Sequence, residues 1–222
     1  MLKTLKMLTF LAVILSFYLR LIRRWIKHWG LPNANVVRDL PGSDLIPEPR
    51  YCSTRAIVID APAADIWPWL VQMGQGRGGL YSYDWLENAF GLDFHSADEV
   101  VPELQDLKPG DHICLAPEGE MPLAVTILEP NYALVLRTGQ AGSPQQPGDY
   151  VRGEIAASWA FVLQPIDEKS TRLLVDWRAD WRPGLLADLL NVFMLEPVHF
   201  IMERGMMRGI KNRAERNAST AT

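Results

Sequence analysis

Hydrophobic and polar residues alternate along several short stretches of the chain, as they do in strands with one buried face. In the stretch that ends near Ala179, Leu173, Val175 and Trp177 alternate with residues that include Asp176. Turn sequences such as Pro-Glu-Gly and Glu-Pro-Asn separate these stretches. The pattern predicts six strands, at residues 53–60, 112–116, 123–128, 132–138, 155–164 and 171–179.

Helical patterns occupy three other segments, residues 62–73, 82–90 and 183–216. Pro62 suits the first turn of the first helix, and Pro68 is expected to kink it. Gly91 is placed to end the second helix. The third is the longest, and we expect an interruption near Pro197.

The order of these elements indicates an α+β fold. One strand and two helices come first, followed by a run of antiparallel strands and the long terminal helix. A single curved sheet must bury its concave face, and the terminal helix is the only element long enough to cover it. Small side chains between the sheet and this helix would leave a cavity there.

The first thirty residues form a separate, apolar segment. An uncharged run of 13 residues lies between Lys6 and Arg20; as a helix it would extend about 20 Å, short of the ~30 Å hydrocarbon core of a bilayer. Residues 16–20 lack the pattern of a signal-peptide cleavage site. Three interpretations stay open: an uncleaved membrane anchor, an interfacial amphipathic helix, or a helix docked on a soluble domain. We predict membrane association through residues 7–26.

The charges of the chain are unevenly distributed behind a formal net charge of −4. Residues 1–30 carry six basic and no acidic side chains, whereas the other 192 residues carry 16 basic and 26 acidic ones. The acidic body argues against a nucleic-acid partner, and the basic head suits anionic lipid head groups. With 48% hydrophobic residues, the composition is globular, which excludes disordered, collagen-like and disulfide-stapled classes.

The domain organisation follows from these shifts in composition. Residues 1–30 form the head, residues 31–50 hold four prolines and form an irregular linker, and residues 51–216 form the folded domain. We expect residues 217–222 to be a disordered tail and residues 139–149 to be a flexible polar loop.

Metal and nucleophile signals are weak. The four histidines are widely separated, and His112-Ile113-Cys114 alone is no zinc pattern. No GxSxG motif is present. We therefore predict neither a metal nor another cofactor. Cys52 and Cys114 are expected on strands as buried thiols rather than as a disulfide.

Several motifs resemble the START-like superfamily, also called the SRPBCC or polyketide cyclase/dehydrase group. They are TRAIVIDAP (54–62), IWPWLVQMG (66–74), GQGRGGLYSYDWLEN (74–88), ELQDLKPGD (103–111) and EPVHFIMERGMMRGIKNRAE (196–215). The match covers residues 36–216, and the later motifs resemble an uncharacterised bacterial subgroup that often has an apolar N-terminal segment. The resemblance implies a helix-grip fold, with six or seven strands wrapped round the terminal helix and an apolar pocket inside. With the apolar head, it also implies a location at the bacterial inner membrane.

The glycine-rich segment 74–79 literally satisfies GxGxxG. A dinucleotide site needs a strand before this loop, whereas a helix is predicted there, so we reject the nucleotide interpretation. Either the loop is a tight connection whose glycines adopt positive φ, or it gates a pocket in which Arg77 binds an anionic ligand head.

A polar and aromatic patch follows this loop; its members are Tyr81, Tyr83, Asp84, Trp85, Glu87 and Asn88. Asp84, Glu87 and Tyr83 are candidates for acid–base catalysis. The alternative, which we favour, is a buried hydrogen-bond network that holds the short helix against the glycine loop.

Large apolar side chains are candidates for the walls of the cavity. Together with Arg77, the predicted ligand-binding residues are Tyr81, Trp85, Trp69, Trp159, Trp177, Met202 and Met206. Gly205 and Gly209 leave one stripe of the terminal helix bare, for close packing against the sheet or for a ligand.

Three functions remain in competition. The leading hypothesis is a membrane-tethered protein that binds a lipid or another hydrophobic small molecule in the cavity. The second is an enzyme of cyclase, dehydratase or hydrolase type that uses the same pocket. The third is a structural or interaction module whose cavity is filled by its own side chains, which a cavity below about 300 Å³ would favour.

Overall fold

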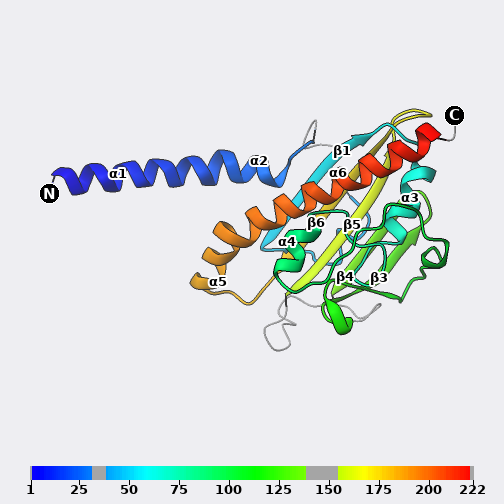
Figure 1. Cartoon of the computed structure of the whole chain (residues 1–222). Coiled ribbons are helices and arrows are strands. Elements are labelled where there is room, and N and C mark those ends of the chain that lie inside the picture. Colours follow the sequence, from blue (N-terminus) through cyan, green and yellow to red (C-terminus); the bar gives the residue numbers. More distant parts are fainter. Residues whose placement is uncertain (1, 32–38, 139–154, 221–222) are drawn as a thin grey trace.

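The computed structural model describes residues 2–31, 39–138 and 155–220. Its centre is one antiparallel sheet of six strands in the order β1-β6-β5-β4-β3-β2 (Figure 1). The strands are β1 Tyr51–Ile59, β2 His112–Cys114, β3 Pro122–Glu129, β4 Ala133–Thr138, β5 Ala156–Pro165 and β6 Thr171–Asp180. The α+β class and all six predicted strands are confirmed, and each predicted end lies within two residues of the observed one.

The inner face of the sheet carries the residues that the alternating pattern selects. Trp159 of β5 lies opposite Trp177 of β6, and Phe161 lies opposite Val175 in the same register. Phe161 and Val175 have no exposed surface. The core therefore lies between this face of the sheet and the helices that cover it.

Two short helices lie between β1 and the remaining strands. Helix α3 spans Ala63–Val71, follows Pro62 and contains Pro68. Helix α4 spans Asp84–Ala89, and Gly91 follows it with a φ of 77°, which glycine adopts without strain. Single 3-10 turns occur at Pro102–Leu104 and Pro117–Gly119.

The terminal helix runs along the sheet, as expected, in three parts. They are α5 (Leu185–Leu190), a π-helical stretch η6 (Asn191–Leu195) and α6 (Glu196–Thr220). The expected interruption near Pro197 is this π-helical stretch rather than a break, because a wider turn accommodates the ring and the missing N–H of proline. Helix α6 continues to Thr220, so residues 217–220 are helical and the expectation of a disordered tail is wrong for them.

The N-terminal segment is also helical and projects from the molecule (Figure 1). It consists of α1 (Leu2–Phe17), a second π-helical stretch η1 (Tyr18–Ile22) and α2 (Arg23–Lys27). The described side chains of α1 are almost all exposed, whereas Ile26 of α2 is buried. Docking on the domain therefore applies to the second half of this segment and not to α1.

Among the described residues, the helix long and apolar enough to cross a membrane is Leu185–Ala218, and only 11% of its apolar window is buried. This corrects the expectation that such a helix lies at the N-terminus. The 18 residues 185–202 at the start of this helix contain only two charged side chains, Asp188 and Glu196.

Other parts of the chain follow the expectations in part. Residues 39–50 of the predicted linker form turns and bends, yet Leu40 and Ile46 are buried, so this part packs on the domain. Cys52 and Cys114 are free thiols, as expected, and both are half-buried. The predicted polar loop at 139–149 lies outside the described residues.

Candidate functional site

An apolar pocket of about 190 Å³ lies between the sheet and α6, at the place where the order of elements predicts a cavity. Trp159 and Trp177 supply its wall on the sheet, and Met202 and Met206 supply its wall on α6. The remaining lining residues come from the segment 80–94, the β2–β3 region and α6: Leu80, Ser82, Glu87, Leu92, Phe94, Leu115, Met121, His199 and Glu203.

The volume restricts what the pocket can hold. Ligand pockets commonly enclose about 300–1,000 Å³, whereas a cavity of about 150 Å³ holds a benzene molecule. The observed 190 Å³ is below the criterion of about 300 Å³. The volume therefore favours a structural or interaction module whose cavity is filled by its own side chains. If the pocket binds a ligand without opening, that ligand has the size of a single ring and not of a whole lipid.

Glu87 introduces a carboxyl group into these apolar surroundings. Its residue is 2% exposed, and among the described residues neither carboxyl oxygen finds a hydrogen-bond partner. Burial, together with the nearby Asp84 carboxylate, raises the pKa of Glu87 to about 7. At neutral pH this group exchanges a proton readily, and when protonated it offers an O–H donor to the pocket.

The raised pKa makes stability depend on pH in a defined direction. Because the folded pKa of about 7 lies above the unfolded value of 4.5, the folded protein binds more protons between these values and loses stability as pH rises. We expect the free energy of unfolding to fall by about 2.5 kcal/mol from pH 5 to pH 8. Urea denaturation across this range measures the change.

Two variants separate Glu87 from the other titrating groups. Glu87→Gln should remove this part of the pH dependence, whereas Glu103→Gln, which changes an exposed carboxyl, should leave it in place. A Glu87→Gln protein with the same pH profile as the wild type would contradict the assignment.

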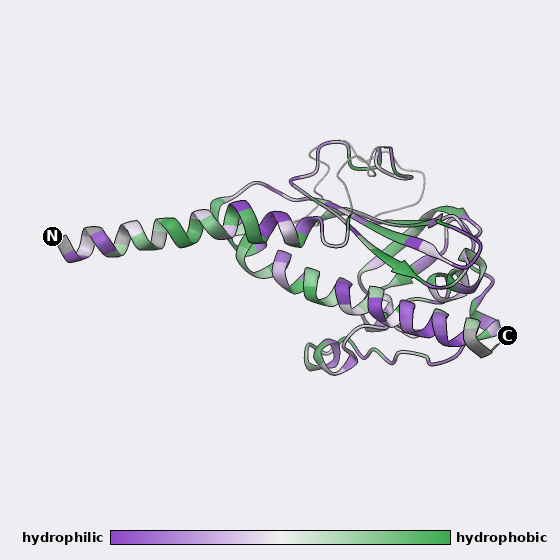
Figure 2. Cartoon of the chain, turned by 90° about the horizontal axis from the view of Figure 1, so that it is seen from above, coloured by the Kyte–Doolittle hydropathy of each residue, from purple (hydrophilic) through white to green (hydrophobic). Residues whose placement is uncertain are grey.

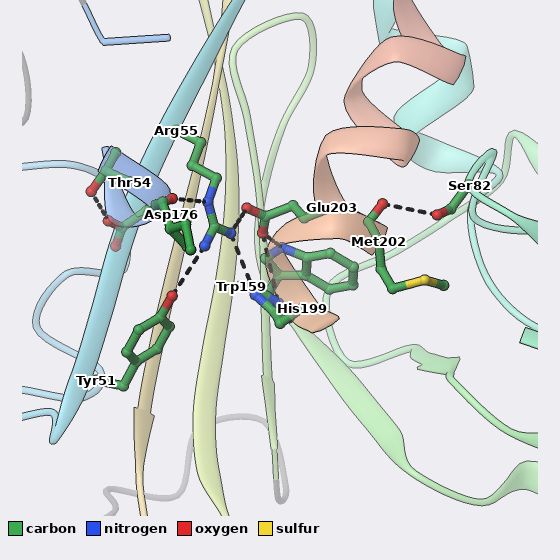
Figure 3. Close-up of polar contacts among 10 residues, drawn as sticks. Tyr51, Thr54, Arg55, Ser82, Trp159, Asp176, His199, Met202 and Glu203 are labelled. Carbon is green, nitrogen blue, oxygen red and sulfur yellow. Dashed lines mark hydrogen bonds and ion pairs between the residues drawn. The ribbon is translucent and has the colours of Figure 1, made fainter. Parts of the chain in front are cut away.

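The polar end of the pocket is a buried cluster that lines it through Trp159, His199 and Glu203, and Figure 3 shows the polar contacts of this cluster. Glu203 accepts a hydrogen bond of 3.1 Å from Trp159 Nε1 through one oxygen and forms an ion pair with Arg55 through the other. The side chains of Arg55 and Glu203 are 0% and 1% exposed. Arg55 also donates to Tyr51 Oη at 3.0 Å and to the Ile26 carbonyl at 2.8 Å. Glu203 lines the pocket, but its negative charge is balanced by the Arg55 guanidinium.

His199 lies beside this cluster and faces the pocket. Its ring packs against Trp177 with centroids 4.9 Å apart and the ring planes tilted by 40°, and its Nδ1 lies 3.4 Å from Arg55 Nη1. Burial is the main cause that lowers the pKa of His199 to about 4, with Arg55 acting in the same direction and Glu203 opposing it. The imidazole is thus neutral at pH 7, and the pocket holds no free positive charge from this group.

Comparison with known proteins adds fold-level likeness only. No family model matches the chain, and no curated protein matches it. Among solved structures it is similar to a conserved protein from Geobacillus kaustophilus, with 17% identity, 75% of this chain and 96% of that chain covered, and a TM-score of 0.44. It is also similar to the Zhui aromatase/cyclase from Streptomyces sp. R1128, with 16% identity, 76% and 95% covered, and a TM-score of 0.41.

A third similar structure is the di-domain ARO/CYC StfQ from the steffimycin biosynthetic pathway, at 16% identity and a TM-score of 0.41. The match covers 76% of this chain and 51% of StfQ. Aromatase/cyclases are thus among the proteins that the chain resembles in structure. At these identities and TM-scores the likeness carries nothing about function, and membership of the START-like superfamily stays a prediction.

Five of the residues that the sequence proposed for the site come together in the pocket: Glu87, Trp159, Trp177, Met202 and Met206. Trp85 lies on the same short helix as Glu87 but is 73% exposed. Trp69 and Tyr81 are buried in the core, where their rings meet edge to face. Their part in binding a ligand stays a prediction without a pocket contact to support it.

Arg77 takes part in a different set of contacts. Its guanidinium donates to the main-chain carbonyls of Met73, Val71 and Leu104 at 3.0–3.2 Å. These bonds tie the end of α3 to the 3-10 turn at 102–104, and the glycines at 74, 76 and 79 adopt positive φ in the loop between. The tight-connection interpretation of the glycine loop is therefore confirmed, and a ligand contact by Arg77 stays a prediction.

Asp84 and Asn88 form the structural network that we favoured for the patch. Asp84 accepts hydrogen bonds from Ser96 N and Oγ at 2.7 and 2.6 Å, and Asn88 exchanges two bonds with the main chain of Phe94. They hold α4 against segment 94–96 rather than against the glycine loop. Tyr83 precedes α4 and packs on Gly205, so of the three catalytic candidates the pocket contains only Glu87.

The polar end of the pocket was not predicted from the sequence. Arg55 and Glu203 are 148 positions apart, so no local spacing connects them. The available signal was a charged residue inside an apolar run, since Arg55 stands in the predicted strand and Glu203 among the methionines of the terminal helix. Among the described residues, no group of three or more His, Cys, Asp or Glu side chains is placed to hold a metal ion.

Proposed function

We propose that the protein binds a small hydrophobic molecule with one hydrogen-bonding group in the pocket between the sheet and α6, while residues 7–26 hold it at a membrane. The observation that carries the binding proposal is the Glu87 carboxyl, buried in an apolar pocket without a partner. An unsatisfied buried polar group costs about 1–3 kcal/mol, and a module that only filled its own core would gain by replacing it. A ligand oxygen next to Glu87 would supply the missing partner.

The proposed tether rests on charge and exposure. Phe10, Val13 and Phe17 on α1 are 64%, 61% and 55% exposed, and basic residues flank this stretch on both sides. Exposed apolar side chains between cations are typical of a segment that enters a lipid interface. A soluble helix of this composition would leave a large apolar surface in water.

A matched pair of test compounds probes the pocket directly. Acetophenone and α-methylstyrene have nearly the same shape, and only acetophenone has a carbonyl oxygen. We expect acetophenone to shift the ¹³C-methyl NMR signals of Met202 and Met206 and to bind roughly fivefold more tightly at pH 5.5, since one net hydrogen bond contributes about 1 kcal/mol. At pH 8.5 Glu87 is ionised and the preference should vanish.

Substitutions at Glu87 complete this test. Glu87→Gln keeps a neutral donor, so it should keep the preference for acetophenone and lose the pH dependence, whereas Glu87→Leu should bind both compounds equally. If neither compound moves the signals of Met202 and Met206 at either pH, the pocket does not bind ligands of this class.

Acid–base catalysis is the second candidate function. The pKa of about 7 for Glu87 favours it, because a general acid or base works best when its pKa lies near the ambient pH. An enzyme would lose turnover in Glu87→Gln, which cannot transfer a proton, while ligand binding persists. A protein that only binds its ligand would show no turnover to lose, in the wild type or in Glu87→Gln.

A further inference from the structure

The start of the C-terminal helix exposes an unusually apolar surface. Between Leu185 and Ile201, nine large apolar side chains are 42–79% exposed, and Figure 2 shows hydrophobic residues gathered at this end of the helix and along α1. We call this surface, residues 185–201, the C-terminal ridge. An exposed apolar area of this extent marks a contact with a membrane or another protein.

The ridge lies beside the N-terminal helical segment. Tyr18 Oη donates to the Val192 carbonyl at 2.7 Å, and the Tyr18 ring stacks on Phe193 with centroids 5.4 Å apart. One turn further along both helices, Arg23 forms a bidentate ion pair with Glu196 at 2.7 and 2.8 Å. The two helices therefore run in the same direction and leave the domain at the same end (Figure 1).

The charges around this junction suit a lipid surface. The Arg23 charge is paired with Glu196, whereas Arg20 and Arg24 are exposed on the same stretch of helix. Asp188 is the one acidic residue between positions 185 and 195; it accepts a bond from Trp181 Nε1 at 2.9 Å and lies 4.0 Å from Arg50. Exposed cations on the neighbouring N-terminal segment thus accompany the apolar side chains of the ridge, and such cations attract anionic lipid head groups.

We propose that the C-terminal ridge is a second membrane-contacting surface, which lies in the head-group region of the bilayer next to α1. Its 17 residues extend about 25 Å as a helix, short of the ~30 Å apolar core. From Glu203 onward, α6 is committed to the domain, where Met207, Ile210 and Ala214 are fully buried. An interfacial position therefore fits the ridge, and a transmembrane one does not.

The ridge and the pocket use neighbouring faces of the same helical turns. Val198 and Ile201 are 42% and 49% exposed on the outside, whereas His199 and Met202 line the pocket. A bilayer against the ridge would therefore lie close to the pocket wall that α6 supplies. The inference rests on the proposed tether only for the choice of a membrane as the partner. Separate labels on α1 and on the C-terminal ridge distinguish the failure of one proposal from the failure of the other.

Single cysteines in the full chain test this proposal. In a background with Cys52→Ser and Cys114→Ser, Leu186→Cys and Met194→Cys report on the ridge and Ile14→Cys on α1. Ile166→Cys, at an exposed apolar position in the turn between β5 and β6, serves as control. Each is labelled with a polarity-sensitive fluorophore. The labelled protein is mixed with vesicles of phosphatidylcholine containing one quarter phosphatidylglycerol and lipids with a nitroxide on the upper acyl chain.

We expect the labels at positions 186 and 194 to shift to shorter emission wavelengths and to be quenched by the nitroxide lipid at least about twofold more than the label at 166. If the label at 14 responds and those at 186 and 194 do not, the tether stands and the ridge proposal is wrong. If the ridge labels respond and the label at 14 does not, the proposed tether is wrong. Silence at all three positions overturns both.

The same labels also detect the competing occupant. A blue shift at position 186 or 194 that appears without vesicles and grows with protein concentration would assign the ridge to a second copy of the chain. That result would overturn the membrane proposal for this surface.

Discussion

Replacing Glu203 by alanine is expected to lower the free energy of unfolding by about 3–5 kcal/mol, because it leaves the buried Arg55 guanidinium without a counter-charge. Neither side chain of this ion pair reaches solvent, so water cannot replace the lost carboxylate. The substitution also leaves Trp159 Nε1 without its acceptor. Chemical denaturation at pH 7 measures the loss.

A double substitution distinguishes the pairing from the space that the side chains fill. Arg55→Met combined with Glu203→Leu should recover much of the stability lost in Glu203→Ala, because apolar residues of similar volume commonly replace a buried pair at little cost. Asp106→Ala is the matched control: it breaks the exposed pair with Lys108, whose members are 65% and 80% exposed, and should change stability by less than about 1 kcal/mol. A Glu203→Ala protein as stable as this control would mean that Arg55 finds another partner.

The effect should reach the N-terminal segment as well. Arg55 Nε donates to the carbonyl of Ile26, which joins α2 to the strand that carries Arg55. Arg55 thus connects the helix that leads to α1, the edge strand of the sheet and the polar end of the pocket. Loosening of this connection is measurable as faster amide exchange around Ala56, whose N–H donates to the Trp29 carbonyl.

The strands were predictable from sequence because their signal is local. A period of two residues with Leu173, Val175 and Trp177 on one side needs no knowledge of the partner strand. The long terminal helix was predictable for the same reason, and so was its irregularity near Pro197. The prediction of a disordered tail was wrong for residues 217–220, because they continue the packed helix α6. The sequence of these residues alone does not show that they belong to this helix.

The pocket was predictable in outline and not in detail. Trp159, Trp177, Met202 and Met206 follow from the architecture, since inward positions on the sheet and on α6 must face each other. Tyr81 and Trp85 were both expected at the ligand, but α4 begins only at Asp84 and Tyr81 has a φ of 58°. Tyr81 therefore lies in the core while Trp85 is exposed. The Arg55–Glu203 contact depends on tertiary folding and has no local signal.

Gly209→Ala is expected to destabilise the protein by at least about 3 kcal/mol, although alanine is the better helix former by about 1 kcal/mol. A Cβ at this position would lie 1.9 Å from the Tyr81 carbonyl oxygen and 2.8 Å from Tyr81 Cβ. The bare stripe on α6 therefore serves close packing, and its neighbour is the loop before α4 rather than the sheet. Tyr81 cannot retreat easily, because its hydroxyl donates to the Trp69 carbonyl at 3.1 Å and Arg213 lies over its ring.

Gly205→Ala is the matched control, because it makes the same change one turn earlier in the same helix and has the same gain in helix propensity. Its Cβ would meet the Tyr83 ring edge at 2.7 Å and Ser82 Oγ at 2.9 Å, which are side-chain atoms that can move. We expect this variant to lose less than about 1 kcal/mol. Thermal and urea denaturation of both proteins compare the two contacts directly. Equal stabilities would show that α6 does not approach the main chain of Tyr81 as closely as described, and α4 with Glu87 would then lose its fixed distance from the wall formed by Met202 and Met206.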